Sequence, residues 1–332
     1  MKKFFLKRWF LLLLVGGISL ATWMPRSLQP VVGVLEPKVI VSVALFLMAW
    51  CLESRHLLRT LLRPWPAVWA VFISYGLLPA LAWTASLLLE VADFRIGLMI
   101  AASVPCTLAS AVLWTRMARG NEATALLVTL LTTGTSWLAT TGWLIFGTGT
   151  QVGFDIGNLM LALFLVLVLP VGIGQLFQAI PPLGRFAIRY KTGLGVVSKI
   201  LVFSIIFRAA VEVFDKLEGG SAMVATTSIG AVAAACLAIH LIGLTFGFWS
   251  SRALRFDRPN QIAVAFGCSQ KSLPVALFLY QTYAEAYPLA VIPLAIYHMG
   301  QLIVDTVIAE RMADGGHHKM EMPDEAQLIS GE

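Results

Sequence analysis

The chain has 332 residues, of which 58% are hydrophobic and only 13% are charged. A soluble domain carries about 25% charged residues, so this composition excludes an ordinary soluble enzyme or binding domain. The apolar residues stand in long blocks, and blocks of about 20 residues are what a membrane-spanning helix requires. The net charge of +6 is spread over many short loops, which indicates membrane topology rather than a nucleic-acid partner.

The apolar blocks predict an all-α membrane protein with ten transmembrane helices. Their approximate ranges are 9–24, 37–52, 67–89, 95–115, 122–146, 157–180, 192–212, 221–250, 261–283 and 288–309. The basic N-terminus resembles a signal peptide, but Met24-Pro25-Arg26 offers no small-residue cleavage site, so we interpret the first block as an uncleaved span. We treat residues 1–312 as one transmembrane unit and the polar residues 313–332 as a disordered cytoplasmic tail.

The distribution of lysine and arginine supports this count. With both termini in the cytoplasm, 17 of the 24 basic residues lie inside, as the positive-inside rule requires. The outside carries only Arg26, Lys38, Arg95 and Lys216, and three basic residues lie within spans: Lys199, Arg208 and Lys271.

The sequence offers no sign of an enzyme. Its four cysteines form neither a disulfide framework nor a metal-binding spacing. The chain lacks the motifs of an intramembrane protease or a prenyltransferase, such as Gly-x-Ser-Gly on a helix, a membrane aspartate pair, an Asp-rich motif or His-Glu-x-x-His. We expect no catalytic residue and no cofactor beyond a coupling ion.

The most informative stretch is Gly267-Cys268-Ser269-Gln270-Lys271-Ser272-Leu273-Pro274, in the middle of the ninth block. A lone ammonium near the bilayer centre costs about 2.5–3.5 kcal/mol, so it normally marks a polar pathway or a paired site. The Gly, Ser and Pro residues around it predict a broken helix, which is tolerated at membrane depth only where protein or a wet cavity covers the freed backbone. Snorkelling is the main alternative, but Lys271 is about ten positions from either end of its span.

A second break is predicted in the fourth span, at Val104-Pro105-Cys106-Thr107-Leu108-Ala109-Ser110. Ten spans divide as five plus five, and an odd number in each half makes the second half enter the membrane inverted. The fourth and ninth spans then hold corresponding positions, which is where inverted-repeat transporters build their sites. A kink or a packing role is an equally good reading of Pro105 alone.

Such a crossing would place polar groups near the midplane. Pro274 suits the first turn of the second half-helix, and Ser272 is a candidate cap for that turn. Neutral oxygens around the crossing are expected from Thr107, Ser110, Thr115, Thr129, Thr132, Thr133, Ser269 and Gln270.

Four further polar residues lie in the spans, and two of them, Asp305 and His298, are ambiguous. Arg208 and Glu212 fit a local i,i+4 pair. Asp305 is close enough to the inner end of the tenth span to be interfacial. His298, at mid-span, is a candidate lining residue of the cavity.

The sequence resembles the bile acid:sodium symporter superfamily, and within it the branch that includes vertebrate solute carrier family ten, member seven, and its bacterial relatives. The likeness covers roughly residues 5–312. It rests on Ser110–Ala123, which includes Ala118-Arg119-Gly120-Asn121, on Phe266–Leu273, and on Pro293-Leu294-Ala295-Ile296-Tyr297-His298. The matched polar residues Asn121 and His298 are therefore candidate binding residues as well.

The resemblance implies a panel of helices 1, 2, 6 and 7 and a core of helices 3–5 and 8–10. The panel helices are about 9–24, 37–52, 157–180 and 192–212, and the core helices lie within about 67–146 and 221–309. In that fold the discontinuous helices 4 and 9 cross, and substrate enters between panel and core. Sodium-coupled members hold two ions behind the crossing; by position Ser110, Thr129 and Gln270 match such ligands, and Ser74 stands where helix 3 contributes a glutamine.

The chain departs from the sodium-coupled pattern at three positions. Phe266 stands where that branch has a glutamate shared by both ions, Ala125 replaces a serine ligand, and Lys271 replaces an asparagine. Without the carboxylate, Na⁺ loses its only anionic partner. Our hypothesis is that Lys271 stands in for a bound cation, with proton loading and release at its amine as a further option.

The resulting interpretation is a secondary transporter that moves an organic anion by alternating access across the inner membrane of a bacterium. The resemblance implies Na⁺ coupling; a proton-coupled or uniport carrier of the same fold is the alternative. A cation/proton antiporter usually needs a membrane aspartate at the crossing, and we expect none there. A regulatory membrane protein that carries no solute is the alternative from another class. Candidate substrate- or ion-binding residues are Ser74, Thr107, Ser110, Asn121, Thr129, Ser269, Gln270, Lys271, Ser272 and His298.

Overall fold

A computed structural model describes residues 23–52, 60–148, 155–218 and 226–314, with a few residues between 13 and 21. Regular structure in these ranges is entirely helical. Seven of the described helices are long and apolar enough to span a membrane, or eight if the bent pair α2 (Pro25–Val32) and α3 (Pro37–Trp50), which meet at 70°, forms one span. The all-α membrane class is confirmed, while the count of ten stays a prediction. Most of the predicted first span and of the predicted tail lies outside the described residues.

The other helices follow the predicted spans closely. The third to fifth spans correspond to α5 (Trp65–Phe72), η1 (Ile73–Leu77) and α6 (Leu78–Ser86); α7 (Ala92–Ser103) and α8 (Ser110–Met117); and α9 (Glu122–Thr148). The sixth and seventh correspond to α10 (Ile156–Leu163), η2 (Phe164–Val168) and α11 (Leu169–Ala179); and, after the short α12 (Pro181–Arg189), to α13 (Lys191–Glu218). The last three are α14 (Thr226–Ala253); α15 (Arg258–Ser269) and α16 (Leu273–Tyr283); and η3 (Pro288–Ala290) with α17 (Val291–Asp314).

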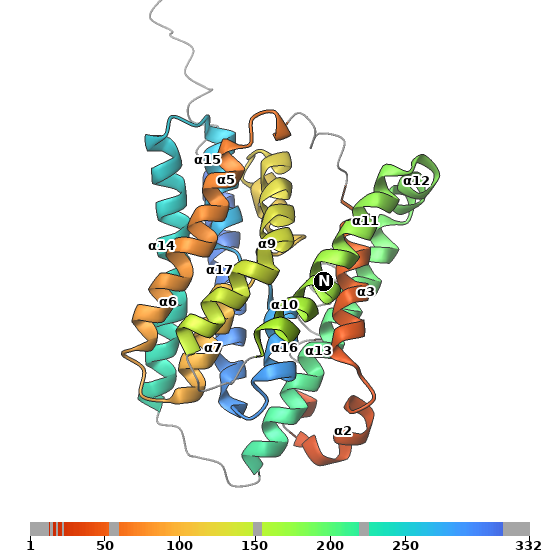
Figure 1. Ribbon diagram of the computed structural model, residues 1–332, viewed down its shortest axis with the longest axis vertical. Helices are drawn as coiled ribbons and strands as arrows, with labels where there is room; N and C mark the ends of the chain where they lie inside the picture. The colour runs from red at the N-terminus through yellow and green to blue at the C-terminus, as the bar shows by residue number, and fades with distance from the viewer. Residues whose placement is uncertain are drawn as a thin grey trace, which may run out of the picture.

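The helices gather in two groups (Figure 1). In one group α3 packs against α11 and α13, and α13 packs against α2. In the other group α15 packs against α5, α9 and α14, and α7 packs against α6, α9 and α17. The segments α10 and α16 lie between the two groups in this view, and α16 contacts α3 and α13 of the first group as well as α7 and α17 of the second.

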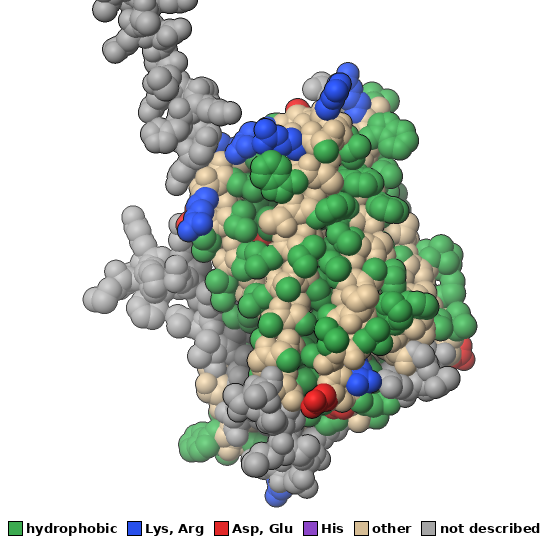
Figure 2. Space-filling model, turned by 90° about the vertical axis from the view of Figure 1, so that its left-hand side faces the viewer, with side chains coloured by type: hydrophobic (Ala, Val, Ile, Leu, Met, Phe, Trp, Pro, Cys, Tyr) green, Lys and Arg blue, Asp and Glu red, His purple; other side chains and the backbone are tan. Residues whose placement is uncertain are grey.

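The outer surface has the character expected of a lipid-facing protein. Figure 2 shows apolar side chains over most of the height of one face, with lysine and arginine side chains gathered mainly at one end. On α14 the exposed residues include Leu241, Phe246 and Trp249. A soluble protein rarely exposes so continuous an apolar surface, so the acyl chains of a bilayer are the natural surroundings of this face.

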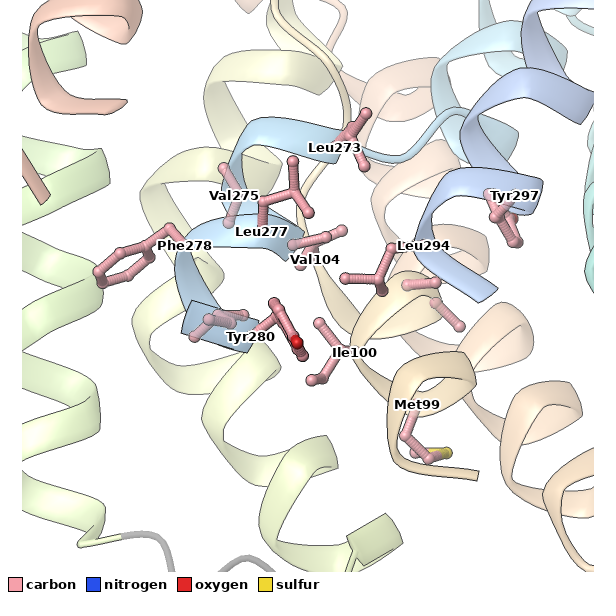
Figure 3. Packing of buried hydrophobic residues seen from close by; sticks show 14 of the residues in the cluster. Met99, Ile100, Val104, Leu273, Val275, Leu277, Phe278, Tyr280, Leu294 and Tyr297 are labelled. Carbon is pink, nitrogen blue, oxygen red and sulfur yellow. The ribbon is translucent and has the colours of Figure 1, made fainter. Parts of the chain in front are cut away.

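The ninth span is the central element of the fold. Of its most apolar stretch, 94% is buried inside the protein, against 22–56% for the other described spans. Figure 3 shows side chains of its second half, including Leu277 and Tyr280, packed among Ile100 and Val104 of the fourth span. Because protein surrounds this span almost completely, its polar break faces protein and not lipid.

Both predicted breaks are present and they touch each other. The fourth span stops at Ser103 and resumes as α8 at Ser110, and the ninth stops at Ser269 and resumes at Leu273. The backbone N–H of Ser272 donates to the carbonyl of Pro105 at 3.0 Å. Pro274 occupies the first turn of α16 as expected, but Ser272, although it is the N-cap, makes no capping hydrogen bond with its side chain, so that expectation was wrong.

Candidate functional site

The amine of Lys271 is buried at the junction of the two breaks. The residue is only 2% exposed. Its Nζ donates to the carbonyl of Ser74 at 2.8 Å, to the hydroxyl of Ser74 at 3.0 Å and to the carbonyl of Val104 at 3.1 Å. It also lies 5.2 Å from the centre of the Tyr75 ring, in a cation–π contact. In the described part of the chain this ammonium is therefore held by neutral oxygens and an aromatic face, with no carboxylate at salt-bridge distance.

A π-helical turn in the third span makes the Ser74 carbonyl available. In an α-helix this carbonyl would accept from the N–H of Leu78, but here Leu78 donates to Ile73 instead. The next residue, Pro79, has no N–H to offer. The carbonyl of Tyr75 also lacks its α-helical donor, because that donor would be the N–H of residue 79, and the side chain of Trp143 donates to this carbonyl at 2.5 Å instead. Single π turns are frequent at functional sites, and this one exposes a carbonyl to Lys271.

The backbone of Lys271 is satisfied by one side chain. Gln301 on α17 accepts from the Lys271 N–H at 2.9 Å and donates to the Lys271 carbonyl at 2.9 Å. It also contacts Nδ1 of His298 at 3.0 Å, which connects this predicted residue to the break. Since unpaired backbone groups at membrane depth cost several kcal/mol, Gln301 is a major support of the interruption.

Gln270 connects the two breaks through its side chain. Its Oε1 accepts from the hydroxyl of Thr107 at 2.9 Å and from the hydroxyl of Ser110 at 2.7 Å, and these hydroxyls also contact each other. Three of the predicted residues thus form one oxygen cluster, contributed by the break between α7 and α8, by the first residue of α8 and by the break between α15 and α16.

The other side of Gln270 meets a carboxylate that the sequence interpretation misplaced. Nε2 of Gln270 donates to Oδ2 of Asp305, and Oδ1 of Asp305 lies 2.9 Å from Nε2 of His240. Nδ1 of His240 lies 3.2 Å from the carbonyl of Ser269, which also accepts from Tyr297 at 3.3 Å. Asp305 and His240 are fully buried. The expectations that Asp305 is interfacial and that the crossing has no aspartate were both wrong.

The remaining predicted residues have more local partners. Ser269 and Thr129 donate their hydroxyls to carbonyls of their own helices, at Ala265 and Leu126. Asn121 caps α9: its Oδ1 accepts from the N–H groups of Ala123 and Thr124, and its Nδ2 donates to Asn260. The structure therefore does not bring Asn121 to the crossing, and within the described residues no hydrogen bond joins Thr129 to the Gln270 cluster.

The residues fit a two-sodium arrangement poorly. Ser74, which stands at the helix-3 ligand position, is occupied by the Lys271 amine. Phe266, at the position of the shared glutamate, is fully buried in an apolar cluster with Ala118, Leu244 and Ala309. Hard cations favour carboxylate, carbonyl and water oxygens, and the carboxylate nearest to the Gln270 cluster, Asp305, already accepts from Gln270 and contacts His240.

A cavity of about 700 Å³ lies where α3, α10 and α16 meet. It is lined by residues of α3, of α10 with the adjoining η2, and of α16, among them Lys38, Ser42, Asn158, Thr282 and Tyr283. The helix α16 runs from the Lys271 break to this cavity, and its 11 residues span about 16 Å at 1.5 Å per residue. The break and the cavity therefore lie at opposite ends of α16.

Comparison with known proteins gives the family of the chain. The sequence model of the SBF-like CPA transporter family matches residues 8–314. The chain belongs to this family. It is 25% identical over 325 residues to sodium/bile acid cotransporter 7 of Danio rerio, covering 91% of this chain and 92% of that protein. The mouse protein of the same name is 25% identical over 322 residues, covering 91% of each chain. An uncharacterized protein of Pseudomonas aeruginosa is 27% identical over 318 residues, covering 92% of each.

Membership of the SBF-like CPA transporter family makes the chain a multi-pass membrane transporter, as the sequence resemblance predicted. Sequence reasoning found Lys271, Gln270, Ser74, Thr107 and Ser110, which the structure brings together. It missed the partners that hold them, Asp305, His240 and Gln301. A signal was present, since His298, Gln301 and Asp305 are spaced so that they share one face of a helix.

Proposed function

We propose that this SBF-like protein is a secondary transporter that moves a small organic anion across the membrane by alternating access. In this proposal, the helices α2, α3 and α10–α13 belong to the panel, and the helices that carry the two breaks belong to the core. The observation that carries the proposal is the buried Lys271 amine at the touching breaks, bound only by neutral groups. Such a site places a positive charge where an anion needs one.

The cavity lined by α3, α10 and α16 supports an anionic substrate. Lys38 is exposed at its lining, and the described chain places no carboxylate within salt-bridge distance of it. Most of the other lining residues are apolar, among them Val39, Leu161 and Leu165. A molecule with an apolar body and an acidic group matches this lining. In the proposed topology, Lys38, the start of α10 and the end of α16 lie on the outer side of the membrane. The cavity is therefore the outer approach to the crossing.

The coupling ion follows from the role that we assign to Lys271. With its amine between Ser74 and Val104, Lys271 takes the place of a bound cation, so we propose transport without a strict requirement for Na⁺. Transport without Na⁺ can take two forms, proton-coupled transport and uniport. The competing hypothesis is sodium symport, which the name of the relatives states for them.

Two measurements on the intact protein test this function. First, purified protein is screened for thermal stabilisation by carboxylates, sulfated anions and steroidal anions; a ligand at 100 times its dissociation constant stabilises the fold by about 2.7 kcal/mol. Second, uptake of the stabilising anion is measured in vesicles with and without an imposed Na⁺ gradient. We expect uptake without Na⁺ and its loss in Lys271→Ala, with Lys199→Ala, an exposed lysine of α13, as the matched control.

The outcomes are separable. Strict Na⁺ dependence together with an active Lys271→Ala variant would refute the replacement of a cation by Lys271. If no anion stabilises the protein or enters the vesicles, anion transport itself is wrong.

One observation supports a second candidate, cation/proton antiport. The structure brings the Asp305 carboxylate to the crossing, which is the feature whose expected absence argued against antiport. Vesicles loaded with a pH-sensitive dye distinguish the two: a pH change driven by Na⁺ or K⁺ in the absence of any organic anion supports antiport and contradicts anion transport as the primary activity.

A further inference from the structure

The break in the ninth span depends on contacts from two other helices. Where α15 stops, its last carbonyls lose their helical donors. The carbonyl of Ser269 is one of them, and His240 of α14 supplies a donor at 3.2 Å. Because a carbonyl only accepts hydrogen bonds, Nδ1 of His240 has to carry a proton; Nε2 carries one as well when it donates to the Asp305 carboxylate, and accepts when residue 305 offers a donor.

Asp305 of α17 contacts both the second ring nitrogen of His240 and the side-chain amide of Gln270. Its two carboxylate oxygens face different partners, Nε2 of His240 at 2.9 Å and Nε2 of Gln270. Asp305 and His240 are both 0% exposed, so no solvent competes for these contacts. One side chain from α17 thereby fixes both residues at the end of α15, Ser269 through His240 and Gln270 directly.

The contact with Asp305 also sets the orientation of the Gln270 amide. A carboxylate oxygen accepts, so the NH₂ group of Gln270 turns toward Asp305 and Oε1 turns toward the hydroxyls of Thr107 and Ser110. Rotated by half a turn, the amide would place its oxygen against the carboxylate and its NH₂ group against the two hydroxyls. The partners of Gln270 in the fourth span therefore depend on a residue of the tenth.

We propose that Asp305, together with His240, is a positioning residue of the crossing that acts by hydrogen bonding and not by its charge. It orients the Gln270 amide toward Thr107 and Ser110 and caps the end of α15 through His240. The inference concerns the site that the proposed transport uses. Its test needs no substrate, so it can fail while the proposed function stands, and the reverse is equally possible.

Hydrogen exchange of the purified full-length protein, read by mass spectrometry, tests the proposal locally. Asp305→Ala removes the acceptor, and we expect exchange in residues 267–273 to rise about tenfold, as the loss of one to two hydrogen bonds implies. Asp305→Asn keeps an acceptor for Gln270 and offers a donor to Nε2 of His240, so its exchange stays within about twofold of the wild-type level. If Asp305→Asn loosens the segment as much as Asp305→Ala does, charge is the cause and the proposal is wrong.

A matched control and a second pair of variants complete the test. Asp93, at the start of α7, accepts a hydrogen bond from the N–H of Leu289. Asp93→Ala removes this carboxylate and should leave the exchange of residues 267–273 unchanged. Gln270→Glu places two carboxylates against each other and should loosen the break. Adding Asp305→Asn to this variant should return the exchange of residues 267–273 toward the wild-type level, because the amide introduced at position 305 can donate to the new carboxylate. Failure of this restoration overturns the proposal even if Asp305→Ala does not fold.

Discussion

At the scale of single residues, the crossing depends on side chains that replace lost backbone hydrogen bonds. Gln301 pairs with both the N–H and the carbonyl of Lys271, and the hydroxyl of Thr132 accepts from the N–H of Cys106 in the other break at 3.2 Å. These contacts allow an irregular backbone to exist inside a bilayer, where water is absent. They are therefore as important to the site as the amine of Lys271.

Gln301 offers a direct test of this view. Gln301→Leu leaves two buried backbone groups unsatisfied, at about 1–3 kcal/mol each, so we expect a thermal midpoint lowered by several degrees. The matched control is Gln281→Leu on α16, because the Gln281 amide is buried with no hydrogen-bond partner in the described structure and its replacement should be neutral or stabilising. Thermal unfolding in detergent measures both, and equal losses would contradict the assignment to Gln301.

At the scale of elements, a change of helix type decides which carbonyl reaches the site. The π turn η1 and Pro79 together free the carbonyl of Ser74 for Lys271. A similar arrangement recurs in the sixth span, where η2 precedes Pro170 and the hydroxyl of Ser42 donates to the carbonyl of Val166 at 3.3 Å. The two turns differ in consequence, since only η1 presents its carbonyl to the buried amine.

Pro79→Ala should separate stability from function. The new N–H lets the third span return to α-helical bonding, in which Leu78 donates to Ser74 in competition with Lys271. We expect a thermal midpoint equal to or above the wild type, because a helical bond of about 1 kcal/mol is restored, together with a several-fold weaker response to the stabilising anion. Pro170→Ala makes the same backbone change at η2. If the anion response falls no further in Pro79→Ala than in Pro170→Ala, the role given to η1 is incorrect.

At the scale of the whole molecule, the cavity is bordered by helices that the proposed alternating access would move relative to each other. Its walls come from α3, α10 and α16, of which the proposed function assigns α3 and α10 to the panel and α16 to the core. Because α16 also begins at the Lys271 break, a change at the cavity has a direct mechanical route to the crossing. Small displacements of packed helices are a common means of such coupling.

Lys38 should attract the anion to this cavity. Lys38→Gln removes the charge and keeps a polar side chain, so we expect the concentration of anion needed for half-maximal stabilisation to rise about three- to tenfold, as an exposed charge contact of about 1 kcal/mol implies. The effect should shrink in high salt. Arg63→Gln, in the connection before α5, is the control. An unchanged affinity in Lys38→Gln would place the substrate elsewhere.

Much of the fold and part of the site could be predicted from the sequence. The long apolar blocks gave the spans because a bilayer leaves little choice of element, and Gly, Ser and Pro around Lys271 gave the break. Asp305, His240 and Gln301 could not be placed by the same means, since their roles arise from contacts 30–65 residues away along the chain. The π turn was missed because Gly76 and Pro79 are equally compatible with a simple kink.

The covalent attachment of the Lys271 amine has an energetic consequence. A sodium ion that accompanies a solute crosses the membrane and contributes its own gradient, whereas in the proposed transport an ammonium fixed to the polypeptide would return with every cycle and contribute none. Over a full cycle only the monoanion then crosses, so one negative charge is moved. A potential of 100 mV, negative inside, opposes its accumulation by about 2.3 kcal/mol. Without a further ion to compensate, the same voltage favours expulsion of the anion from the cell.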